Sequence, residues 1–144
     1  MTRPFGILLV EDSESDILLV NKAIEKLGMD CQLHVVRDGE DFVEFFRNGN
    51  GENGSKKNNI DLILLDLNML RMNGFEVLEH RNSDPDLKDI PVVILTSSLN
   101  DKDIEKAYEL GANGYLAKPI EIDVFMETVA KAAVYWHNLF RQDF

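Results

Sequence analysis

The sequence predicts a doubly wound α/β domain, with five parallel strands in one sheet and helices on both of its faces. Three observations lead to this fold class. Short apolar runs occupy consecutive rather than alternating positions, which is typical of strands covered on both faces. Segments with helical spacing of apolar residues separate these runs. The connections are short, and parallel strands need right-handed crossovers, which place helices on both faces.

Five runs are expected to form the strands. The clearest cover residues 7–10, 62–65 and 92–95, which are rich in leucine and β-branched side chains. Residues 33–36 are a weaker candidate because His34 interrupts the apolar run. Residues 114–117 are expected to form the last strand because of their place in the alternating series.

Five helices are expected between and after these strands. The first begins near Ser13 and ends at Gly28, a residue suited to a left-handed C-terminal cap. The others cover approximately residues 41–46, 74–82, 101–110 and 121–140. Residues 47–59 are rich in glycine, asparagine, lysine and serine and lack a periodic apolar face, so we expect a long polar surface loop there.

Composition limits the classes of partner. The chain has 26 acidic and 15 basic side chains and a formal charge of −11, which argues against nucleic-acid and anionic-membrane binding. No apolar stretch approaches the roughly 20 residues that span a bilayer. The single cysteine, Cys31, cannot form an internal disulfide, which favours a cytoplasmic location. We therefore expect a protein or a cation as partner.

Polar residues follow four of the five predicted strands. Glu11 and Asp12 follow the first, Asp66 closes the third, Thr96 closes the fourth and Lys118 follows the fifth. In the strand order 2-1-3-4-5, the first and third strands are neighbours about 4.8 Å apart, so the three carboxylates should converge. Any one of these residues alone would fit an ordinary solvated loop, but the whole set points to one site.

This set predicts a magnesium-assisted phosphoacceptor. Three carboxylates in one small space favour a hard cation, and Mg²⁺ fits better than Ca²⁺ because it needs only one or two carboxylates and leaves room for a phosphate oxygen. On the other side of Asp66, the Lys118 ammonium and the Thr96 hydroxyl are expected to bind phosphoryl oxygens. The Asp66 carboxylate would attack phosphorus and form an aspartyl phosphate.

Four segments resemble the receiver domain of two-component response regulators. They are residues 8–12 (LLVED), residues 66–69 (DLNM) with Gly74, residues 96–98 (TSS), and Lys118-Pro119. This resemblance covers nearly the whole chain and implies a five-stranded parallel sheet with five helices, the flavodoxin-like or CheY-like fold. It also implies that a sensor histidine kinase phosphorylates Asp66.

The resemblance assigns further roles at the site. Asp12, Asp66 and the backbone carbonyl of Asn68 would hold Mg²⁺, and Glu11 would act through water. Thr96 and Tyr115 would form the conformational switch. The Lys118–Pro119 bond would be the family's cis peptide.

The sequence departs from the family in the loop after the phosphoacceptor. Leu70 stands where the family usually has proline, and leucine removes a fixed φ from this loop.

We expect residues 1–144 to form a single receiver domain without an output domain. The chain would not be an enzyme in the ordinary sense, because it would catalyse only its own phosphorylation and slow dephosphorylation. It would signal through contacts with an unknown downstream protein and form a symmetric homodimer through the fourth helix, fifth strand and fifth helix. The proposed interface residues are Tyr135, Trp136, Leu139 and Phe140. Trp136 fits equally well as a cover for the sheet.

The polar loop, residues 83–91 and the aromatic last helix look most like cyanobacterial phytochrome response regulators, which implies a phytochrome histidine kinase as the phosphodonor. Other single-domain receivers, such as chemotaxis regulators, stay open. Two alternatives come from other classes. A haloacid-dehalogenase-like hydrolase would use Asp66 but needs a second carboxylate where Asn68 stands. A phosphorylation-independent adaptor would keep the acidic cluster without using it.

Overall fold

Consecutive apolar positions produce a sheet whose three central strands are buried on both faces. The computed structural model describes residues 3–48, 59–69, 72–98 and 100–141. These residues form one parallel sheet in the order β2-β1-β3-β4-β5, as predicted. The strands are β1 (Phe5–Val10), β2 (Cys31–Val36), β3 (Leu62–Leu65), β4 (Val92–Thr96) and β5 (Gly114–Ala117). The helices are α1 (Glu14–Leu27), α2 (Gly39–Asn48), α3 (Gly74–Ser83), α4 (Asp101–Glu109) and α5 (Ile122–Arg141).

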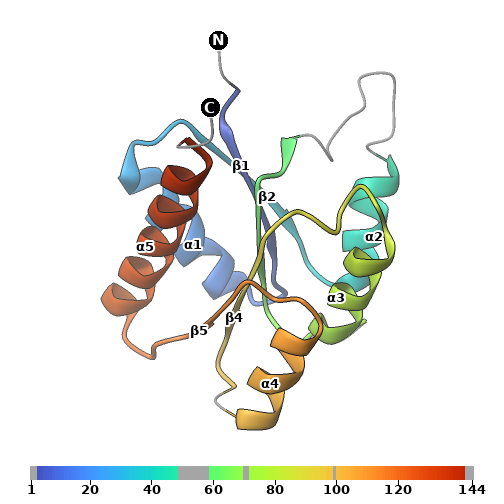
Figure 1. Cartoon of the computed structure of the whole chain (residues 1–144). Helices are drawn as coiled ribbons and strands as arrows, with labels where there is room; N and C mark the ends of the chain where they lie inside the picture. The colour runs from blue at the N-terminus through green and yellow to red at the C-terminus, as the bar shows by residue number, and fades with distance from the viewer. Residues whose placement is uncertain (1–2, 49–58, 70–71, 99, 142–144) are drawn as a thin grey trace.

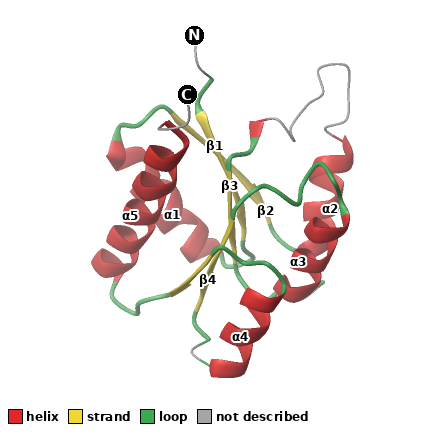
Figure 2. Ribbon diagram, in the orientation of Figure 1, coloured by secondary structure: helices red, strands yellow, loops and turns green. Residues whose placement is uncertain are grey.

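The helices lie on the two faces of the sheet, with α1 and α5 on one side and α2 and α3 on the other (Figures 1 and 2). Strand side chains point alternately to the two faces. In β1, Ile7 and Leu9 pack with α1 and α5, whereas Leu8 and Val10 pack with α2 and α3. This alternation between two apolar layers explains why β1 and β3 carry no polar side chains.

Two strands, β1 and β2, start two residues earlier than predicted, whereas β5 has the predicted bounds. β2 starts at Cys31 rather than residue 33, because an edge strand is half exposed and tolerates Gln32. β1 starts at Phe5, and α2 extends beyond the predicted residues 41–46. The predicted polar loop falls mostly on residues 49–58, outside the described residues, as does Leu70.

The ends of α1 agree with the prediction. The Ser13 side chain caps the N-terminus by accepting a hydrogen bond from the Asp16 N–H, and Gly28 adopts a left-handed conformation with φ 66°. In the described part of the chain, no helix is long and apolar enough to cross a membrane.

Gly74 allows α3 to start directly against the end of β3. A Cβ atom at this position would lie 2.7 Å from the Asp66 carbonyl oxygen, closer than real side chains come. The Gly74 N–H donates to the Leu67 carbonyl at 3.1 Å. Because Gly74 has no side chain, α3 can pack directly against the backbone of Asp66 and Leu67.

Arg81 on α3 is a buried cross-link away from the strand ends. Its guanidinium donates to the Ile90 carbonyl through Nε at 3.1 Å and through Nη2 at 2.8 Å. It also donates to the Gly111 carbonyl, at 3.2 Å, and to the side chains of Asn82 and Asn113. Burial lowers the pKa of this side chain, and the nearby Asp89 opposes that shift. Arg81 thus ties α3 to the turns before β4 and before β5.

Replacing Arg81 with methionine should lower the free energy of unfolding by about 3 kcal/mol, because buried carbonyl groups lose charge-assisted donors. Urea denaturation followed by circular dichroism measures this change. The matched control is Arg47→Met, which removes the same charge from an exposed side chain and should change stability by less than about 0.5 kcal/mol. Equal effects of the two substitutions would contradict the cross-link.

Candidate functional site

The carboxyl ends of β1 and β3 bring three acidic side chains together, as the predicted strand order requires. Oxygen atoms of Glu11, Asp12 and Asp66 lie within 4.8 Å of one another. Glu11 and Asp66 are buried, whereas Asp12 is accessible to solvent. The sheet pairing continues into the site, since the Asp66 N–H donates to the Val10 carbonyl at 3.0 Å. The acidic cluster is therefore held by the sheet itself.

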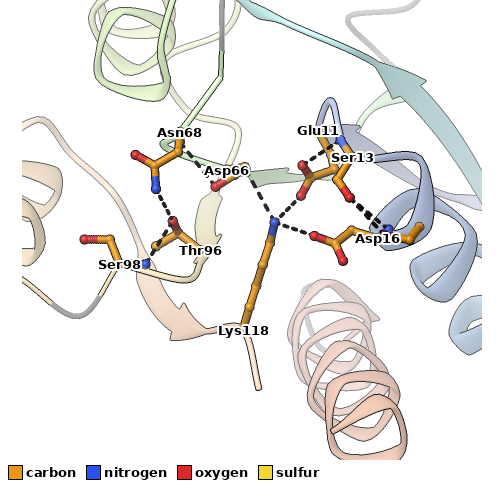
Figure 3. Close-up of polar contacts among 9 residues, drawn as sticks. Glu11, Ser13, Asp16, Asp66, Asn68, Thr96, Ser98 and Lys118 are labelled. Atoms are coloured by element: carbon orange, nitrogen blue, oxygen red, sulfur yellow. Dashed lines mark hydrogen bonds and ion pairs between the residues drawn. The ribbon is translucent and has the colours of Figure 1, made fainter. Parts of the chain in front are cut away.

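Lys118, which follows β5, neutralises part of this cluster. Its ammonium donates to Glu11 Oε1 at 2.5 Å, to Asp16 Oδ2 at 2.8 Å and to Asp66 Oδ2 at 3.4 Å. Figure 3 shows the ammonium between Asp66 and the α1 side of the pocket. The expectation that Lys118 lies on the opposite side of Asp66 from the other carboxylates, beside Thr96, is wrong. The buried carboxylates of Glu11 and Asp66 need a cation, and the lysine chain reaches both.

The Glu11 carboxylate is the most buried acid of the site. Burial raises its pKa to about 7, with the Asp66 charge adding to the rise, while the hydrogen bond from Lys118 and that from the Ser13 N–H act in the opposite sense. Burial by itself would lower the pKa of Lys118, but its hydrogen bonds to Asp16 and Glu11 outweigh this and raise it. Lys118 is therefore charged at neutral pH. Glu11 forms a direct ion pair with Lys118, whereas the resemblance implied only that it would act through water.

Thr96 lies on the far side of Asp66 from Lys118 (Figure 3). It is fully buried at the end of β4, and its Oγ1 accepts hydrogen bonds at 3.4 Å from the Asn68 side-chain amide and from the Ser98 N–H. The Asn68 backbone N–H donates to Asp66 Oδ1 at 3.3 Å. The half-buried Tyr115 donates its hydroxyl to the Ser98 carbonyl at 2.9 Å. These bonds link the neighbourhood of Asp66 to the loop that leads into α4.

Asp16 is a site residue that the sequence analysis missed. It is in the first turn of α1 and shares the Lys118 ammonium with Glu11. Helical spacing does not identify it, because Asp12 precedes the N-cap Ser13 and lies outside α1.

Two other expectations have structural outcomes. Among the residues that the structure describes, no peptide bond is cis, so the Lys118–Pro119 bond is trans. That expectation is wrong, and the trans form is the one that an X-Pro bond favours by about 0.5–1 kcal/mol.

Of the proposed interface residues, Tyr135 and Leu139 are exposed, whereas Trp136 packs against the core. The side chain of Phe140 is not among those described.

The cluster of Glu11, Asp12 and Asp66 fits a hard divalent cation. All of its donors are carboxylate oxygens, and one of the three residues is open to solvent. Cysteine and histidine, which zinc prefers, do not contribute to this cluster.

The chain belongs to the family of response regulator receiver domains, whose model matches residues 7–130. Its curated relatives include the response regulator Rcp1 of Synechocystis, 40% identical over 92% of this chain and 89% of Rcp1. Another is the "Probable methanogenesis regulatory protein FilR2" of Methanothrix harundinacea, 36% identical over 92% of this chain and 84% of that protein.

Solved structures show the same relationship. The phosphorylated cyanobacterial phytochrome response regulator RcpA superposes with a TM-score of 0.83 at 38% identity, covering 92% of this chain and 94% of RcpA. The Mn²⁺-bound form of Rcp1 superposes with a TM-score of 0.82 at 40% identity and the same coverages. Receiver domains bind Mg²⁺ or Mn²⁺ at an acidic pocket, and the cluster described above fits such a pocket.

Replacing Asp12 with asparagine should weaken Mg²⁺ binding by roughly tenfold or more, because a charged oxygen ligand becomes a neutral one. Isothermal titration calorimetry with MgCl₂ measures the affinity. Asp30→Asn is the control, since it removes the same charge from an exposed residue that is not part of the cluster. Equal Mg²⁺ affinities for wild type and Asp12→Asn would contradict the assignment of this cluster as the cation site.

Proposed function

We propose that Asp66 accepts a phosphoryl group from a sensor histidine kinase, with Mg²⁺, and that the phosphorylated chain signals through protein contacts. The observation that carries this proposal is the position of Asp66. Its buried carboxylate lies in the acidic cluster, within 3.4 Å of the Lys118 ammonium, and Thr96 lies on its other side. The Asp66 nucleophile therefore has the cationic Lys118 on one side and the Thr96 hydroxyl group on the other.

The residues of the site act by position and charge. In the transfer, an Asp66 oxygen forms a bond to phosphorus while the bond from phosphorus to the kinase histidine nitrogen breaks. The Asn68 N–H holds the other Asp66 oxygen, because it donates to Oδ1 whereas Lys118 donates to Oδ2. Lys118 neutralises charge on the transferred group, and Thr96 offers its hydroxyl. The carboxylate is already charged, so the attack needs no general base.

Glu11, Asp12 and Asp66 are the residues that would hold the cation. The resemblance to receiver domains adds the backbone carbonyl of Asn68. When bound, Mg²⁺ supplies charge neutralisation for the anionic carboxylate and phosphoryl oxygens. The chain would otherwise turn over no substrate, and would only phosphorylate itself and slowly lose the phosphoryl group.

The phosphodonor we propose is a phytochrome histidine kinase. RcpA, which is 38% identical, is described as a phosphorylated phytochrome response regulator. The output would be contacts with a downstream protein, and Thr96 and Tyr115 would convey the change from Asp66 to the surface of α4, β5 and α5.

Incubation of wild type with Mg²⁺ and acetyl phosphate should add one phosphoryl group, detected by intact-mass spectrometry, whereas Asp66→Asn should add none. The second arm replaces acetyl phosphate with an autophosphorylated phytochrome histidine kinase and should label the same residue. Asp12→Asn should slow labelling in both arms, because it weakens the cation site. An unlabelled wild type in both arms would contradict the proposal.

The same samples separate the two alternative classes. Turnover of a generic phosphate ester would favour a hydrolase, although Asn68 stands where that chemistry needs a carboxylate. Identical partner binding by wild type and Asp66→Asn would favour a phosphorylation-independent adaptor.

We further propose a symmetric homodimer through α4, β5 and α5. Large apolar side chains are exposed on and around these elements: Tyr108, Ile120, Ile122, Val124, Tyr135 and Leu139. A hollow of about 420 Å³ beside β5 and α5 includes Tyr135 and Trp136 in its lining. Of these, Tyr135 and Leu139 are one helical turn apart on α5, and exposed apolar groups on one helix face are typical of an interaction surface that a two-fold axis could pair with its own copy.

Leu139→Glu should weaken dimerisation by roughly 30-fold or more, because burying a charge at an interface core costs about 2 kcal/mol or more. Sedimentation velocity measures the shift to monomer, with and without acetyl phosphate. The matched control is Leu18→Glu, which adds the same charge at an exposed leucine on α1. A wild type that is monomeric under both conditions would contradict the dimer.

A further inference from the structure

Asp16 makes a contact with the phosphoacceptor site from outside the acidic cluster. Its Oδ2 accepts a hydrogen bond from the Lys118 ammonium at 2.8 Å. The group of carboxylates placed to hold a cation consists of Glu11, Asp12 and Asp66 and does not include Asp16. Figure 3 shows Asp16 reaching the ammonium from α1, on the side away from Asp66. Asp16 therefore contacts the cationic side chain of the site and not the nucleophile.

The local structure of α1 leaves this carboxylate free to reach Lys118. Asp16 is three residues after the N-cap Ser13, where an acidic side chain commonly turns back to accept the N-cap N–H. Glu76 does so in α3, where it accepts the N–H of Asn73. In α1 the Ser13 N–H donates instead to Glu11 Oε2 at 3.1 Å. Glu11 thus takes the bond that Asp16 would otherwise make.

The three bonds of Lys118 account for all three hydrogens of its ammonium. They are unequal, with the nitrogen 2.5 Å from Glu11, 2.8 Å from Asp16 and 3.4 Å from Asp66. The ammonium is therefore drawn toward β1 and α1. The longest of its three contacts is the one to the nucleophile.

We propose that Asp16 is a positioning residue for Lys118. It holds the ammonium back from Asp66, so that the nucleophile stays available and a phosphoryl group has room between the two. This inference rests on the proposed phosphoacceptor role of Asp66. Lys118 is only 11% exposed, so the oxygens near its ammonium are few, and losing one of them redistributes its bonds among the others.

Without the Asp16 charge, the ammonium closes on the next carboxylate. A charge-assisted pair between lysine and carboxylate settles at about 2.8 Å. At that distance Lys118 occupies the space in front of an Asp66 oxygen and withdraws its electron density. The attacking oxygen is then both less accessible and less nucleophilic.

Crystal structures of metal-free wild type and Asp16→Asn test the positioning without any reaction. Asparagine keeps the shape of the side chain and removes its charge. The distance from Lys118 Nζ to Asp66 Oδ2 should shorten from the 3.4 Å of wild type to about 2.8 Å in the variant. An ammonium that stays in place in Asp16→Asn overturns the inference.

The kinetic arm measures phosphorylation by acetyl phosphate at saturating Mg²⁺. Asp16→Asn should lower the maximal rate constant roughly tenfold or more while changing the half-saturating acetyl phosphate concentration less than about twofold. Glu14→Gln is the matched control, because it removes the same charge from the same turn of α1 and Glu14 pairs with the exposed Arg37. It should leave both constants unchanged within about twofold.

The outcomes are separable. An unchanged or higher maximal rate in Asp16→Asn, or an equal loss in Glu14→Gln, overturns the inference. A wild type that is never phosphorylated overturns the proposed function, and the crystallographic distance still decides whether Asp16 positions Lys118.

Discussion

The ion pairing of one buried ammonium group is the interaction on which the site depends. Lys118 donates to Glu11, Asp16 and Asp66, and Glu11 is only 2% exposed. Burying these carboxylates without a cation would be costly, since an unpaired buried charge costs several kcal/mol. With Asp12 included, the carboxylates still outnumber the single ammonium. This remaining negative charge explains why the pocket suits a divalent cation.

The fold keeps this arrangement rigid and also connects it to the surface. The parallel sheet aligns the ends of β1, β3 and β4, and Gly74 lets α3 pack directly behind Asp66. From Thr96, hydrogen bonds run through Ser98 to the hydroxyl of Tyr115. A change at Asp66 that moves Thr96 would therefore reach the loop that leads into α4.

The parts of the structure that follow from chain order were predictable. Consecutive apolar runs identified the central strands, and parallel topology determined that Glu11, Asp12 and Asp66 meet. What depended on side-chain competition was not predictable. The direction of the Asp16 side chain depends on which acidic residue accepts the hydrogen bond from the Ser13 N–H. The side of Asp66 on which Lys118 lies depends on which buried carboxylates its ammonium neutralises. The edge strand β2 was predicted too short because its half-exposed side chains do not form a continuous apolar run.

A crystal structure with Mg²⁺ and beryllium trifluoride, a mimic of the phosphoryl group, tests the central claim most directly. The account predicts the mimic on Asp66, the cation among Glu11, Asp12 and Asp66, and the Lys118 ammonium within hydrogen-bond distance of a fluorine atom. A mimic bound elsewhere, or a Lys118 side chain directed into solvent in that complex, would contradict it.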